Sequence, residues 1–273
     1  MGKFDGILFC TDLDGTLYRN DKTVSKENLD AIEYFKKEGG RFTFITGRVP
    51  ITATRICEII KPNAPYGCIN GGGIYDFVED RYLWNETLPQ DVKELICSVR
   101  DELPEIGIQV NAEKQVYFIR DNAAMVNFRS VTGLPNISKE LEAIDDPMLK
   151  IIFAHHEEEQ ICKVQKLLRS HPKADKFDFI RSEHSLYEIL PKGVSKGNLL
   201  LKLADLLGID RNKTIAVGDY DNDISMVKCA GIGYAVSNAR DSVKEVADKI
   251  TVSNEENAIA AIIEEFDRGT LVI

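Results

Sequence analysis

The sequence predicts an α/β protein with a doubly wound parallel sheet and an inserted α+β domain. Three observations predict it. Short apolar runs alternate with helical segments at both ends of the chain, as in strand–helix–strand units. Four of these runs end in a polar or glycine-rich turn, and the middle of the chain instead carries closely spaced pairs of strand candidates.

The first part of the chain follows a strand–helix rhythm. The predicted elements are a strand at 6–10, a helix from Ser25 to Gly39, a strand at 41–45, a helix at 51–60 and a strand at 66–69. The first run is apolar throughout, as a strand buried on both faces should be. The sequence therefore starts with the core domain, predicted over residues 1–83.

The middle of the chain predicts a separate α+β domain over residues 84–190. Strand candidates lie close together there, at 106–110 with 116–119 and at 177–181 with 186–190, which indicates antiparallel hairpins. The earlier rhythm resumes over residues 191–273, with a helix at 195–207, strands at 214–217 and 232–236, and a last helix ending near Phe266. One core domain built from both ends of the chain, with a cap inserted, is the simplest account.

Composition narrows the function classes. The 273 residues carry a net charge of −10, which disfavours nucleic acid and anionic membranes as partners. No apolar stretch approaches the ~20 residues of a membrane span, and the N-terminus lacks a signal-peptide pattern. The six cysteines are scattered without paired spacing, which predicts neither disulfides nor zinc but a reducing, cytoplasmic location. No obligate protein partner is evident.

The four turns should converge, because ligands bind at the carboxyl ends of strands in open α/β sheets. Asp12 and Asp14 follow the first strand, and two acids this close indicate a hard cation such as Mg²⁺. A solvated acidic turn is the alternative for this segment alone. Gly15 permits the turn, and Thr16 can cap the helix or flap after it.

The second turn, Thr46-Gly47-Arg48, offers a hydroxyl and backbone amides for a phosphate oxygen. Thr46 as a simple helix N-cap is the alternative. Lys196 begins a helix, where a cation is mildly disfavoured, so it is a candidate to neutralise Asp12 and an incoming phosphate. Lys192 competes with it for that role.

The fourth turn carries three acids and an amide within Gly218–Asp223. Their mutual repulsion predicts a cation there. Asp219 is the best direct ligand, and Asp223 or Asn222 could support it. Asn70 and Asn238 sit at two further strand ends and could orient a substrate, or could be turn residues that tolerate left-handed backbone.

These motifs resemble those of the haloacid dehalogenase (HAD) superfamily phosphatases. Asp12-Leu-Asp-Gly-Thr-Leu17, Thr46-Gly-Arg48, Lys196 and Gly218-Asp-x-x-Asn-Asp223 match its four motifs in order and rough spacing. Asn70-Gly-Gly72 and Gly193-Val-Ser-Lys-Gly197 look like the Cof-type branch with a type IIB cap. Two departures, Gly72 after Asn70-Gly71 and Val236-Ser237 before Asn238, weaken only substrate inference.

The resemblance implies specific roles. Asp12 would be the nucleophile and an Mg²⁺ ligand, forming an aspartyl-phosphate. Asp14 would be the general acid and base and would contact the metal through its carbonyl, with a pKa that crowding by acids is expected to raise. Thr46 and Lys196 would bind the phosphoryl group, helped by Gly15, Thr16, Gly47, Arg48, Asn70, Asn222 and Asn238. Asp219 and Asp223 would complete the metal site.

The implied function is an Mg²⁺-dependent hydrolase of small phosphorylated metabolites, sugar phosphates first and then flavin or pyridoxal phosphates. A phosphomutase of the same superfamily is the alternative enzyme. A phospho-acceptor signalling domain is a different class, but it places its acids on different strands and needs no inserted domain. Here Asp12 and Asp14 share one strand end.

Overall fold

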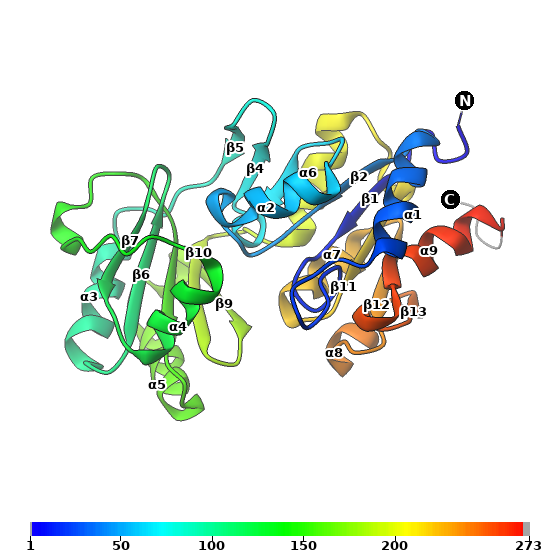
Figure 1. The fold of residues 1–273 in the computed structure, drawn as a ribbon. Helices are drawn as coiled ribbons and strands as arrows, with labels where there is room; N and C mark the ends of the chain where they lie inside the picture. Colours follow the sequence, from blue (N-terminus) through cyan, green and yellow to red (C-terminus); the bar gives the residue numbers. More distant parts are fainter. Residues whose placement is uncertain (1, 270–273) are drawn as a thin grey trace. The chain divides into compact units, whose positions relative to one another are not determined.

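The computed structural model describes residues 2–269, and the chain divides into two compact units (Figure 1). The first unit combines the chain up to Trp84 with the chain from Ser195 onward. The second unit is the continuous segment Asn85–Val194. None of the helices within residues 2–269 has the length and hydropathy needed to cross a bilayer.

A five-stranded parallel sheet forms the centre of the first unit. In spatial order its strands are β13 (Lys249–Thr251), β12 (Ile232–Val236), β11 (Thr214–Gly218), β1 (Leu8–Thr11) and β2 (Arg41–Phe44). Every neighbouring pair is parallel. All four residues of β1 are buried, as expected for a central strand covered on both faces.

Helices pack on both faces of this sheet (Figure 1). The helices of the first unit are α1 (Lys26–Lys37), α2 (Pro50–Ile60), α6 (Lys196–Leu207), α7 (Ile224–Cys229), α8 (Asp241–Lys244) and α9 (Ala258–Asp267). Successive side chains of a strand point to opposite faces. Leu8 and Cys10 of β1 therefore join an apolar cluster with α6, whereas Phe9 contacts Phe35 of α1, with ring centroids 5.8 Å apart. The predicted doubly wound architecture is confirmed.

Side-chain caps fix where two of these helices begin. Ser25 Oγ accepts a hydrogen bond from Asn28 N at 3.2 Å, and Ser195 Oγ accepts one from Asn198 N at 3.1 Å. Each bond satisfies one of the amide groups that the first turn of a helix leaves unpaired. The cap on Ser195 places Lys196 at the first position of α6.

The strand predicted at 66–69 belongs to a different sheet. It forms β3 (Tyr66–Cys68), which pairs antiparallel with β4 (Gly73–Asp76), and β4 is followed in the sheet by β5 (Arg81–Asn85). A single parallel bridge between Ile45 and Gly67 links β3 to the end of β2. The strand ends early because Ile69 and Asn70 adopt positive φ angles of 57° and 54°.

The second unit contains a five-stranded antiparallel sheet. In spatial order its strands are β7 (Val116–Arg120), β6 (Gly107–Ala112), β8 (Met148–Ala154), β10 (Leu186–Pro191) and β9 (Phe177–Glu183). The two predicted hairpins form as β6–β7 and β9–β10. β8 joins them and was not predicted from the sequence, because periodicity does not separate a short buried strand from a buried helical segment.

Helices give the second unit an apolar core of its own. They are α3 (Val92–Glu102), α4 (Ala123–Thr132) and α5 (Glu158–Ser170). The main cluster joins α3 and α5 to one face of the sheet, and Ile151 of β8 lies fully buried in it. Every member of that cluster falls between Leu88 and Ile189. This core therefore needs no residue of the first unit.

A fragment of residues 85–194 should fold by itself, because its apolar core is internal to the segment. We expect a mixed α/β circular dichroism spectrum and a cooperative transition in urea. Ile151→Asp should abolish the transition, since it buries an unpaired charge in that core. A fragment with a coil spectrum and no transition would contradict the expectation.

Candidate active site

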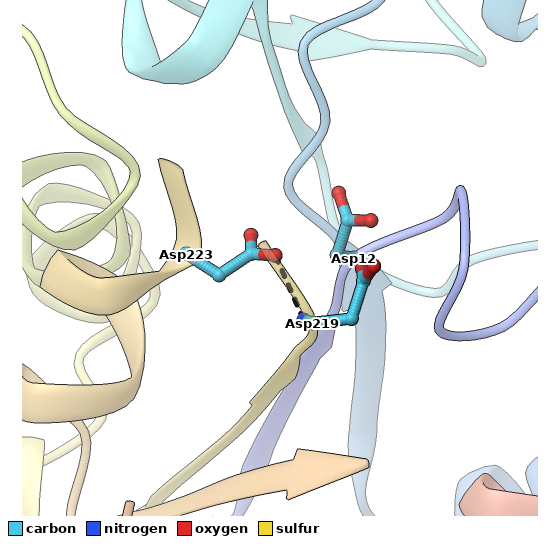
Figure 2. Close-up of side chains that lie close together, drawn as sticks. All are labelled: Asp12, Asp219 and Asp223. Carbon is cyan, nitrogen blue, oxygen red and sulfur yellow. Dashed lines mark hydrogen bonds between the residues drawn. The ribbon is translucent and has the colours of Figure 1, made fainter. Parts of the chain in front are cut away.

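The strand-end turns of the first unit bring their polar side chains together. Asp12 follows β1, and its backbone N–H donates to Val217 O of β11 at 2.9 Å. Asp219 follows β11, and Asp223 lies one short turn later, at the end of the 3₁₀ segment η5 (Asp221–Asp223). Figure 2 shows these three carboxylates gathered beyond the strand ends.

Asp12, Asp219 and Asp223 form the one group of three or more potential metal-ligand side chains in residues 2–269. A ligand atom from each lies within 4.8 Å of the other two. Asp223 is held firmly, because its Oδ2 accepts hydrogen bonds from the backbone N–H groups of Asp219 at 3.0 Å and Tyr220 at 3.1 Å (Figure 2 draws the first). The backbone of the turn thus orients the carboxylate cluster.

Lys196 lies against this cluster and is 1% exposed. Its Nζ donates to Asp12 Oδ1 at 2.5 Å and to Asp223 Oδ1 at 2.6 Å. The competing candidate, Lys192, instead pairs with Asp178 in the second unit, at 2.9 Å. Lys196 is therefore the lysine that contacts Asp12.

Charge balance in this buried group is incomplete, because three carboxylates surround one ammonium. Burial raises the pKa of Asp12 well above its ordinary value, against the opposing charge of Lys196. Burial and the charge of Asp223 raise the pKa of Asp219 to about 7, although a hydrogen bond from Thr16 opposes the change. Buried carboxylates shift in this direction when too little positive charge lies nearby.

These residues fit a divalent cation. A charge of two would balance the carboxylate excess, and carboxylate oxygens are the ligands that Mg²⁺ prefers. One residue before Asp223, the side-chain oxygen of Asn222 is buried with no hydrogen-bond partner among the described residues. Such an acceptor suits the water molecules that Mg²⁺ usually retains.

The turn after β1 also contacts Asp219, through Thr16 and Gly15. Thr16 Oγ1 donates to Asp219 Oδ1 at 2.9 Å, so the Thr16 side chain orients a carboxylate of the cluster. Gly15 has a φ of +83°, and a Cβ there would lie 2.5 Å from Asp219 Oδ2. Only glycine fits this position without displacing Asp219.

Asp14 is placed differently from Asp12. Its two carboxylate oxygens accept from Arg48 Nε at 2.9 Å and Nη2 at 2.8 Å, and Lys22 Nζ donates to Oδ1 at 2.8 Å. Burial raises the pKa of Asp14, but the bonds from Arg48 and Lys22 outweigh it and lower the pKa to about 2. The expected rise in this pKa is wrong, because cations and not acids surround the carboxylate.

The Thr46 turn adjoins Asn70 and Asn222. α2 begins after Val49, so Thr46 is not its N-cap; Thr46 Oγ1 accepts from Arg48 N at 3.2 Å. Asn222 Nδ2 donates to Asn70 Oδ1 at 3.0 Å, and a Cβ on Gly47 would lie 2.8 Å from that same oxygen. The second, third and fourth strand-end turns therefore meet.

Asn238 lies outside this group. Its Nδ2 donates to Gly15 O at 2.9 Å and its Oδ1 accepts from Asn254 N at 3.0 Å, so its amide joins backbone segments. Lys22 also contacts this site but was not predicted from the sequence. It lies in an exposed turn with no motif, and only the fold brings it to Asp14.

Comparisons with known proteins identify the family of this chain. Residues 9–263 match the model of a family described as haloacid dehalogenase-like hydrolase. The chain is 27% identical to the 5-amino-6-(5-phospho-D-ribitylamino)uracil phosphatase YitU of Bacillus subtilis, over 95% of this chain and 97% of that protein. It is 28% identical to the putative phosphatase YxeH of the same organism, over 94% and 97%. A crystal structure of a haloacid dehalogenase-like hydrolase from Bacteroides thetaiotaomicron matches with a TM-score of 0.83 and 26% identity, over 95% and 98%.

Gly15→Ala should weaken Mg²⁺ binding, because the new Cβ would push Asp219 from its position. Gly6→Ala is a matched control: its φ is +79°, but the nearest atom to a Cβ there is Lys213 Nζ at 3.8 Å. Both variants should lose about 1 kcal/mol of stability from the left-handed backbone. Calorimetric titration should show weaker Mg²⁺ binding for Gly15→Ala alone; equal affinities would contradict the placement of Asp219.

Mg²⁺ binding should strengthen as pH rises through about 7, because a cation must displace the proton that Asp219 retains below its raised pKa. An unfolded aspartate loses that proton near pH ~3.9. The folded, metal-free protein therefore binds more protons between these values and loses stability as pH rises from about 4 to 7.

Thermal unfolding between pH 5 and 8 measures the stability of the metal-free protein, and its comparison with unfolding in Mg²⁺ measures how metal binding changes with pH. The Mg²⁺-induced rise in Tm should grow with pH, and Asp219→Asn should reduce that growth. Asp14 does not contribute in this range, since its pKa is about 2. An Mg²⁺ effect that is equal at pH 5.5 and pH 8 would contradict the argument.

Proposed function

The chain belongs to the haloacid dehalogenase-like hydrolases and is a phosphatase of the Cof type. From this premise we propose that it is an Mg²⁺-dependent phosphomonoester hydrolase, which carries the phosphoryl group on Asp12 during the reaction. Because the chain is a phosphatase, it is not a phospho-acceptor signalling domain, the alternative class considered from the sequence. Its substrate is a small phosphorylated molecule.

One observation carries the proposal most directly: Lys196 contacts Asp12 and Asp223 in the same buried cluster that includes Asp219. The charge of Lys196 favours the ionised form of Asp12, which a nucleophile requires, and so opposes the rise in pKa that burial causes. The same ammonium can pair with the oxygens of an arriving phosphate. A structural ion pair alone would not need a third carboxylate beside it.

The phosphoryl group would be held by donors at the strand ends. Lys196 Nζ supplies a charge, and Thr46 can donate its own hydroxyl proton, since its oxygen accepts from Arg48 N. Preorganised donors of this kind stabilise charge on a transferring phosphoryl group.

In the first proposed step, a carboxylate oxygen of Asp12 attacks phosphorus. An oxygen–phosphorus bond forms to Asp12 while the bond from phosphorus to the leaving oxygen breaks. Asp14 gives that oxygen a proton, and the product alcohol departs. Because Asp14 is ionised in this structure, it takes up its proton when the negatively charged substrate arrives.

In the second step, water attacks phosphorus and gives its proton to Asp14. The bond between phosphorus and Asp12 breaks, and inorganic phosphate leaves with Asp12 restored. Mg²⁺ held by Asp12 and Asp219, with Asp223 in support and the Asp14 carbonyl as a further proposed contact, would neutralise the phosphoryl oxygens in both steps. Asp14 thus serves as acid in the first step and base in the second.

The leaving group would be selected by the inserted segment, which we propose as a type IIB cap over residues 84–190. Support comes from the apolar core of the segment, which is built from its own residues and makes it a separate folding unit. The named substrate of YitU carries a phosphorylated ribityl chain. We propose sugar and sugar-alcohol phosphates as the first substrates to test, by screening phosphomonoesters with Mg²⁺.

Substitution of the two acids after β1 should separate their proposed roles. Asp12→Asn removes the attacking carboxylate, so no phosphoenzyme should form and turnover should fall by about 10³-fold or more. Asp14→Asn keeps the nucleophile but lacks the proton carrier. With an aryl phosphate, whose leaving group needs little protonation, this variant should accumulate phosphoenzyme.

Rapid quench with a labelled aryl phosphate, followed by intact-protein mass, distinguishes the two variants. Asp221→Asn is a suitable control, because Asp221 pairs with Arg240 and Ser242 outside the cluster. A phosphoryl adduct on the Asp12→Asn protein would show that another residue is the nucleophile. Wild-type activity that persists fully in excess chelator would refute the Mg²⁺ dependence.

A further inference from the structure

Arg48 follows Thr46 and Gly47 in the second strand-end turn, and that position suggests a phosphate ligand. Its guanidinium group, however, contacts other residues of the protein. Nε and Nη2 donate to the two carboxylate oxygens of Asp14, and Nη1 lies 3.4 Å from Thr52 O. The guanidinium also lies over the ring of Tyr18, with Cζ 5.2 Å from the ring centroid.

The two bonds to Asp14 form a fork, in which two nitrogens of one planar group face two oxygens of another. This geometry fixes the plane and the direction of a carboxylate, which a single ammonium cannot do. Lys22 adds a third bond, to Oδ1 only. The Asp14 side chain nevertheless remains 39% exposed, so a substrate can still reach it.

The backbone of Arg48 is tied to the rest of the site. Its N–H donates to Thr46 Oγ1 at 3.2 Å, and its carbonyl accepts from Ile69 N at 3.0 Å. Thr46 O in turn accepts from Asn70 N at 3.0 Å. The residue that holds Asp14 is therefore anchored to the turn proposed to seat the phosphoryl group.

We propose that Arg48, assisted by Lys22, is a positioning residue for proton transfer, and that it aligns Asp14 with the phosphoryl seat instead of binding the phosphate. The inference rests on the proposed function, because it assigns Asp14 the proton. Arg48 acts through Asp14 and contacts neither the leaving oxygen nor the attacking water. A misplacement of about 1 Å in such a group can cost about 10²-fold in rate.

Arg48→Lys tests the proposal, since it keeps the positive charge but loses the fork. Its kcat/KM for alkyl phosphates should fall by about 10- to 100-fold, because those leaving groups need a well-placed proton. For 2,4-dinitrophenyl phosphate the fall should stay below about threefold. Competitive inhibition by inorganic phosphate should remain unchanged, because the phosphate seat is intact.

Lys22→Met should show the same pattern with a smaller loss, since it removes one bond of three. Arg55→Lys and Lys26→Met are matched controls: Arg55 is exposed on α2, and Lys26 pairs with Asp30 on the surface of α1. Both controls should behave as wild type. Unchanged Tm values would show that the losses in the Arg48 and Lys22 variants are not due to unfolding.

A double variant decides whether Arg48 acts through Asp14. In an Asp14→Asn background, Arg48→Lys should cause no further loss on alkyl phosphates, because the group that it positions is already absent. Additive losses would overturn the proposal. So would an equal loss on every leaving group with weaker phosphate inhibition, which would make Arg48 a phosphate ligand. A faster Arg48→Lys enzyme would also overturn it.

The outcomes separate this inference from the proposed function. If the wild-type enzyme hydrolyses no phosphomonoester with Mg²⁺, the proposed function fails and the Arg48 comparison has no baseline. If the wild type is active and the Arg48→Lys loss does not depend on the leaving group, only the role of Arg48 fails.

Discussion

The contact of one buried ammonium with two carboxylates is the constraint on which the site depends. Lys196 is fully enclosed between Asp12 and Asp223, and each of these groups would be costly to bury alone. Removing Lys196 would leave these carboxylates buried without a compensating cation. The fold must therefore bring α6 against the ends of β1 and β11. Because the Ser195 side chain caps α6, Lys196 is the first residue of this helix and lies at those strand ends.

The backbone is shaped around the same contact. Asp223 can approach the end of β11 only because Gly218 has no side chain: a Cβ there would lie 2.4 Å from the Cβ of Asp223. Two backbone N–H groups then hold one oxygen of Asp223, while its other oxygen accepts from Lys196. Burial, together with the excess negative charge that remains, raises the pKa values of Asp12 and Asp219, and the excess charge also explains the fit to a divalent cation.

Two acids that are neighbours in the sequence acquire opposite electrostatic surroundings. Asp12 lies among carboxylates and is buried, whereas Asp14 lies among cations and is partly exposed. Separate surroundings of this kind suit the two different roles proposed for these acids. The second unit has an apolar core of its own, separate from these surroundings.

The sequence by itself determined the doubly wound core, the hairpins of the second unit and the polar turns at the strand ends, because periodicity and turn residues act locally. Tertiary structure decided the features that depend on which side chains meet in space. It places Lys196, and not Lys192, in contact with Asp12, and it brings Thr16 to Asp219. It also makes Asn238 a link between backbone segments and brings Lys22 to Asp14. It also reversed the expected pKa of Asp14, since a pKa depends on neighbours in space and the sequence shows only neighbours along the chain.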